Sequence, residues 1–138
     1  MNRLERIKGC LLGGAVGDAL GAPVEFLEWP AIEAKFGPQG IIDFAPAYGN
    51  TGAISDETQM MLFTAEGLLR AFVLGSLRQA CHVPSIVHQA LLRWLMTQDY
   101  PSAIPIVTDG WLIKQVELWS RRSPGTTCQI GRASCRER

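Results

Sequence analysis

Residues 51–61, TGAISDETQMM, place a serine, two acids and a threonine immediately before a long apolar run. Ser55 or Asp56 suits the N-cap of a helix, and Asp56 followed three residues later by Gln59 approximates a capping box. Acidic residues in a first turn are also favoured by the helix dipole. The stretch therefore predicts that a helix begins here and continues over residues 56–74.

The same stretch also fits the oxygen-rich edge of a metal site. A cap needs one such side chain, whereas Ser55, Asp56 and Glu57 can converge where the chain has not yet adopted helical geometry. Carboxylate and hydroxyl oxygens are the ligands that magnesium, calcium and manganese prefer. Because three ligands from one turn leave the shell incomplete, others must come from elsewhere in the chain. The two interpretations are compatible, and spacing alone leaves both open.

Outward from this stretch, helical periodicity recurs and no alternating strand pattern exceeds a few residues. The second long helix is apolar on most of its circumference, which predicts a buried central helix. Residues 22–50 are broken by prolines and glycines, and allow only a short helix and a brief extended piece at 40–46. The predicted fold class is all-α, with loops that carry the polar groups. The predicted helices cover residues 4–20, 30–37, 56–74, 84–98 and 110–125.

Four glycines recur at steps of four along the first predicted helix: Gly9, Gly13, Gly17 and Gly21. A glycine inside a helix costs about 1 kcal/mol relative to alanine, so a row of them needs a reason. The row allows close approach of either a neighbouring helix or a ligand, and Asp18 lies where it ends. The sequence leaves both readings open.

Glu25 is an isolated acid, flanked by Val24 and Phe26 in a stretch of little charge. Such a carboxylate is either exposed on a loop or held by a cation. Near a metal ion it could serve as a further ligand or as a proton-transfer group.

Bulk properties narrow the function classes. With 138 residues, one domain is expected. The 13 basic and 13 acidic residues balance, so no nucleic-acid partner is expected. The four cysteines lack the spacing of a zinc site or a redox motif. No secretory signal is recognised and no apolar run is judged long enough to span a bilayer, so a cytoplasmic protein without a membrane partner is expected.

Two long motifs in order carry a resemblance to a known family. GCLLGGAVGDALGAPVEF (9–26) is similar to the glycine-rich opening helix of the ADP-ribosylglycohydrolase family, which includes the dinitrogenase-reductase-activating glycohydrolases. GAISDETQMMLFTAEGLLRA (52–71) is similar to its T-D-D-T metal motif. DGWLIKQVELWSRRSPGTTC (109–128) resembles the helix and P-G-N-T-C loop that contacts ADP-ribose. Thr126 replaces the usual Asn of that loop, and Glu57 the usual second Asp of the metal motif.

The resemblance implies an all-α hydrolase that cleaves the bond joining ADP-ribose to a protein side chain or small conjugate. It implies two magnesium ions, with manganese as an alternative, and stabilisation of an oxocarbenium-like state. Glu25 and Asp56 would be catalytic. The metal ligands would be Ser55, Asp56, Glu57 and Glu25, and the substrate-binding residues Asp18, Gly125, Thr126 and Thr127.

The resemblance also predicts the limits of the domain. Residues 1–128 correspond to the N-terminal part of the family domain, because the late D-x-D-T-type acidic motif does not follow. Residues 129–138 resemble a translated sequencing-adapter oligonucleotide and are expected to be non-native. The fragment is expected to be inactive alone, and the complete protein to be a monomer. The alternative is a non-catalytic, crystallin-like or ADP-ribose-binding helical protein on the same scaffold.

Overall fold

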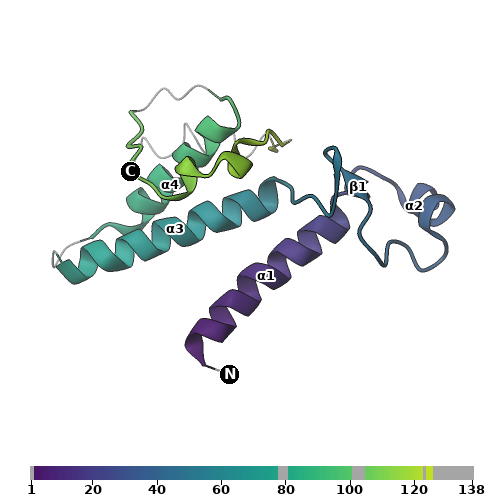
Figure 1. Cartoon of the computed structure of the whole chain (residues 1–138). Coiled ribbons are helices and arrows are strands. Elements are labelled where there is room, and N and C mark those ends of the chain that lie inside the picture. Colours follow the sequence, from purple (N-terminus) through teal and green to yellow (C-terminus); the bar gives the residue numbers. More distant parts are fainter. Residues whose placement is uncertain (1, 78–80, 101–104, 123, 126–138) are drawn as a thin grey trace. The chain divides into compact units, whose positions relative to one another are not determined.

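The computed structural model describes residues 2–77, 81–100, 105–122 and 124–125, and the predicted helical class is confirmed (Figure 1). The chain forms two compact units, Met1–Thr58 and Gln59–Arg138. The elements are α1 (Arg3–Gly21), α2 (Trp29–Phe36), β1 (Pro46–Ala47), β2 (Asn50–Thr51), α3 (Asp56–Leu77), α4 (Val83–Thr97) and the 3-10 helices η1 (Leu112–Lys114) and η2 (Val116–Trp119).

Helix α1 begins with a complete capping box. The Asn2 side chain accepts the Glu5 amide at 2.9 Å, and the Glu5 carboxylate accepts the Asn2 amide at 2.7 Å. Two of the amides left without helical partners at this end are thereby satisfied. The predicted first helix is confirmed, and it runs one residue further at each end.

The first unit continues with α2 and a small hairpin. Pro30 lies in the first turn of α2 and Gly37 follows its last residue, as predicted. In the hairpin, Pro46 pairs with Thr51 and Ala47 with Asn50. Its turn residues Tyr48 and Gly49 have φ of 48° and 83°, the double positive φ that a two-residue turn of the I′ type requires. Of the extended piece predicted at 40–46, only Pro46 is in a strand.

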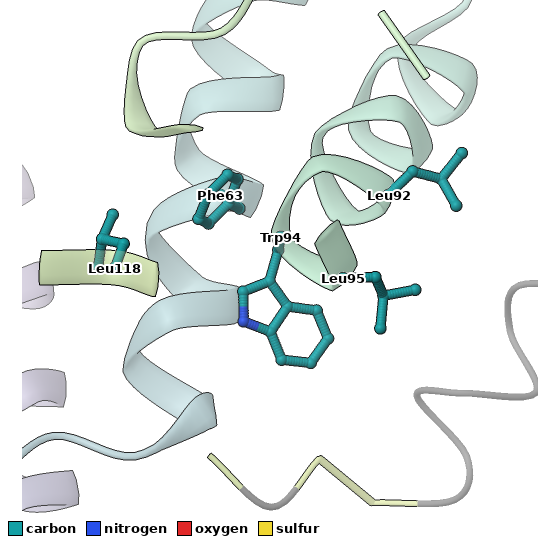
Figure 2. Packing of buried hydrophobic residues seen from close by; sticks show 5 residues of the cluster. All are labelled: Phe63, Leu92, Trp94, Leu95 and Leu118. Atoms are coloured by element: carbon teal, nitrogen blue, oxygen red, sulfur yellow. The ribbon is translucent and has the colours of Figure 1, made fainter. Parts of the chain in front are cut away.

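In the second unit, α3 and α4 pack closely at Gly67. A Cβ on Gly67 would lie 2.9 Å from the Val87 Cα and 3.2 Å from the Ala90 Cβ, so only glycine allows this approach. Phe63 on α3 and Trp94 on α4 belong to the apolar core (Figure 2), where Trp94 extends from α4 with its indole nitrogen toward α3. The remaining buried members of this core are Leu92, Leu95 and Leu118.

The prediction that α3 is a buried central helix holds for only part of its surface. One of its faces is buried, including Phe63 and Ala71, but other large apolar side chains remain in solvent. Because α4 covers only one side of α3, the rest of its apolar circumference has no partner in the described part of the second unit. The exposed side chains are Leu68, Leu69, Phe72, Val73 and Leu77.

By length and composition, α3 is a segment that could cross a membrane, contrary to the expectation that none would qualify. The core helix of a globular protein passes the same test. Glu66 in the middle of α3 forms an ion pair at 3.1 Å with Arg93 on α4, and both side chains are almost fully buried. This pairing integrates α3 into a globular unit.

The prediction of an α-helix at residues 110–125 is also wrong. Within residues 110–125, the described backbone forms two 3-10 turns, η1 and η2. The Glu66 carboxylate accepts the amides of Trp111 and Leu112, the second at 3.0 Å. These amides would lack a partner at the start of any helix, so Glu66 acts as a cap. The extended backbone of Gln115 and Ser120 is what interrupts the helical ladder and limits the segment to short 3-10 turns.

Candidate functional site

A groove of about 600 Å³ lies along the C-terminal half of α1 in the first unit. Glycines of α1, including Gly13 and Gly17, line it together with Asp18, Glu25 and Glu57. A Cβ on any of the four glycines in the row would meet no atom within 4 Å. In the described part of this unit the row therefore does not serve helix packing, and it leaves the backbone of α1 open to the groove. The volume is within the range of small-molecule sites.

Asp18 fixes the turn in which α3 begins. Its Oδ2 accepts the amides of Ser55 at 2.9 Å and Thr58 at 3.2 Å, together with the Thr58 hydroxyl. A carboxylate placed at a helix N-terminus accepts hydrogen bonds from the unpaired amides, and its negative charge interacts favourably with the positive end of the helix dipole. The turn and the end of the glycine row are thus held together by one side chain.

Ser55 supplies the local cap, since its hydroxyl oxygen accepts the Glu57 amide at 3.2 Å. The same hydroxyl donates to the Glu57 carboxylate. The predicted capping box between Asp56 and Gln59 is wrong, because the Gln59 amide group is bound to Trp94, Gln98 and Ser120. Asp18, and not a capping box, accepts hydrogen bonds from the backbone amides at the start of α3.

The carboxylates around this turn influence one another. Burial raises the pKa of Asp56, and the negative charges of Glu57 and Asp18 add to the effect. Partial burial also raises the pKa of Glu25, followed by the charges of Glu57 and Asp56. Several acids are therefore crowded at one end of the groove, and a cation would relieve their repulsion.

Tyr48 is a site residue that sequence reasoning missed. Its hydroxyl donates to Glu25 Oε2 at 3.5 Å, and this hydrogen bond opposes the rise in the Glu25 pKa. Tyr48 reaches Glu25 from the hairpin turn, with an unusual positive φ for a bulky residue. The only available signal was the Tyr-Gly-Asn sequence of that turn, which says nothing about its target.

The donor chemistry of this site fits a hard divalent cation. Ser55, Asp56, Glu57 and Glu25 offer hydroxyl and carboxylate oxygens, the types that magnesium and manganese bind. In the described ranges, however, no group of three or more Asp, Glu, His or Cys side chains converges closely enough to hold a metal ion. A metal ion held by these residues would therefore need further ligands.

The residues expected to contact substrate lie in both units. Asp18 lines the groove of the first unit, whereas Gly125 is an exposed residue of the second. Thr126 and Thr127, also predicted to bind substrate, lie outside the described residues, as does the segment 129–138. The roles of all four substrate-binding residues stay predictions.

Comparisons with known proteins bear on this site. A family model described as ADP-ribosylglycohydrolase matches residues 1–138. The chain is 44% identical over 95 residues to an uncharacterized protein of Archaeoglobus fulgidus, which covers 67% of this chain and 28% of that protein. It is 31% identical over 103 residues to the uncharacterized protein YegU of Escherichia coli. This match covers 70% of this chain and 29% of YegU. The chain thus spans less than a third of these relatives. No solved structure matches it.

Proposed function

This chain belongs to the ADP-ribosylglycohydrolase family, and from that premise we propose that its parent protein is a metal-dependent hydrolase. The substrate is an ADP-ribosylated protein side chain or a small ADP-ribose conjugate. Hydrolysis breaks the glycosidic bond, the anomeric carbon gains the hydroxyl group of water, and the released side chain gains the proton. The observation that carries this proposal is the cluster of acids with raised pKa values at the end of the glycine-lined groove.

In this proposal, Ser55, Asp56 and Glu57 hold a divalent cation, magnesium or manganese, and Glu25 is either a mobile further ligand or, when it is not bound to the cation, the catalytic acid. The family pattern has two such ions. A bound cation would supply charge stabilisation for the ribose oxygens as the glycosidic bond weakens. The remaining ligands belong to a late acidic motif that the chain does not contain.

Glu25 is the residue best suited to exchange a proton with the leaving group. A carboxyl with a raised pKa stays protonated to a higher pH, which favours an acid role. The Tyr48 hydroxyl holds Glu25 Oε2 toward the hairpin and thereby orients the other oxygen. Asp18 contributes by holding the turn that presents Asp56 and Glu57.

The second candidate is a non-catalytic ADP-ribose-binding or crystallin-like protein on the same scaffold. It is favoured by one observation: the acids of the described chain form no complete metal-binding group. It requires the groove and the substrate loop, but no bond cleavage.

Release of ADP-ribose from arginine- and serine-linked ADP-ribosyl peptides would separate the two candidates. We expect the parent protein to show magnesium-dependent release, which is lost in Asp56→Asn and kept in Glu33→Gln, a matched change at an exposed acid of α2. Binding of ADP-ribose without release, in a protein that also contains the late acidic motif, would favour the second candidate. Equal activity of both variants would contradict the assignment of Asp56.

The cellular setting is proposed on the same basis. We propose a cytoplasmic protein that acts on ADP-ribosylated proteins and is monomeric when complete. Fractionation of cells that express the parent protein, and its mass in solution, would test both points.

A further inference from the structure

Two glutamines are fully buried where α3 meets α4. Gln59, in the first turn of α3, and Gln98, directly after α4, have no solvent exposure. Gln59 Oε1 accepts hydrogen bonds from the Trp94 indole at 3.1 Å and from Gln98 Nε2 at 2.9 Å. Because each group fixes the orientation of the next, the two amides have one arrangement that satisfies them.

The remaining polar atoms of the two side-chain amides, Gln59 Nε2 and Gln98 Oε1, form hydrogen bonds with the backbone that follows η2. Gln59 Nε2 donates to the Ser120 carbonyl at 3.0 Å, and Gln98 Oε1 accepts the Arg122 amide at 2.7 Å. Gln98 Nε2 also lies 3.4 Å from the Ser120 carbonyl. Ser120 has extended backbone angles beyond the last 3-10 turn, so side chains take the place of a helical ladder.

Burying two amides is costly unless every polar atom has a partner, and apolar side chains would fill the same space without that requirement. What the amides add is a defined backbone path for residues 120–122. Three residues after Arg122 comes Gly125, which the family resemblance assigns to the ADP-ribose loop. Gln59 also follows Asp56 and Glu57 on the same helix by less than one turn.

We propose that Gln59 and Gln98 are positioning residues that hold the backbone of Ser120 and Arg122, and thereby place the loop at Gly125 for ADP-ribose. The inference rests on the proposed function. Neither glutamine touches substrate or metal in this scheme. They act on affinity for the ADP-ribose group, whereas the acids of the first unit act on the bond that breaks.

The first test is amide hydrogen exchange of this chain. Gln98→Met keeps the side-chain volume but removes the acceptor for Arg122, and Gln59→Met removes the donor to Ser120. We expect at least one of them to speed exchange at Arg122 and its neighbours about tenfold, the factor that corresponds to one typical buried hydrogen bond. The control is Gln89→Met, which removes a glutamine contact from α4 to the Val107 amide instead.

The second test is ADP-ribose affinity, measured by calorimetry with free ADP-ribose. We expect Gln98→Met and Gln59→Met to raise Kd about tenfold while Gln89→Met leaves it unchanged. In a protein with hydrolase activity, KM should rise with little change in kcat, a split that general loss of stability would not produce. Circular dichroism and a cooperative melt would show that each variant is folded.

The outcomes separate the two proposals. Faster exchange with unchanged ADP-ribose affinity would make the glutamines structural only and overturn this inference, while leaving the hydrolase proposal standing. Unchanged exchange in both folded variants would overturn the positioning role directly. A protein that neither binds ADP-ribose nor releases it would overturn the proposed function and the inference together.

Discussion

The Asp18 carboxylate on α1 accepts the amide of Thr58 at 3.2 Å, so a side chain forty residues earlier caps the first turn of α3. The same oxygen accepts the Ser55 amide. The acidic turn thus owes its shape to α1 as much as to its own sequence. This relationship gives Asp18 a structural role that is separate from any contact with substrate.

Replacing Asp18 with alanine should destabilise the protein. Asp18→Ala leaves the Ser55 and Thr58 amides without their acceptor, and loss of such a cap costs about 1–2 kcal/mol. The free energy of unfolding in urea would measure it. Asp43→Ala, at an exposed acid whose only described bond is to the next amide, is the control. Equal effects of the two changes would contradict the capping role of Asp18.

The glycines of α1 and α3 should respond oppositely to alanine. Gly67→Ala places a Cβ 2.9 Å from the Val87 Cα, a backbone atom, and should destabilise the protein by about 1–3 kcal/mol. Gly9→Ala meets no atom within 4 Å and should stabilise α1 by up to about 1 kcal/mol. Thermal and urea unfolding would compare them. Destabilisation by both would mean that the glycine row packs against another part of the chain.

The buried ion pair of the second unit should depend on both partners. Arg93→Met leaves the Glu66 charge buried without its cation and should cost about 3–5 kcal/mol. The double change Glu66→Leu with Arg93→Met should recover part of that loss. The matched control is Arg70→Met, whose partner Asp109 is half exposed, and about 1 kcal/mol or less is expected. Additive losses in the double variant would show that the pair is not coupled.

Stability should fall as the pH rises above about 4. The folded-state pKa values of Glu25 and Asp56 are raised, so between the ordinary and raised values the folded chain binds more protons than the unfolded chain. Their contribution is therefore fully present below the ordinary pKa and is lost as pH rises through the raised value. Urea unfolding at pH 4 to 7 would measure the slope.

Glu57→Gln tests the cause of this pH dependence. The Glu57 charge helps to raise both pKa values, so its removal should flatten the fall in stability. Glu33→Gln, on α2, should leave the slope unchanged. A steeper fall in Glu57→Gln would show that this charge does not repel its neighbours.

The sequence by itself determined the four α-helices, the start of α3 and the family, because these depend on local periodicity, capping residues and two continuous motifs. Only the tertiary structure decided the cap of α3, the partner of Tyr48 and the burial of one face of α3. It also replaced the helix expected at 110–125 by 3-10 turns, which are bounded by the extended backbone of Gln115 and Ser120. The physical reason is range: a helix forms through bonds between near neighbours, whereas a carboxylate such as Asp18 or Glu66 chooses partners about forty residues away once packing brings them together.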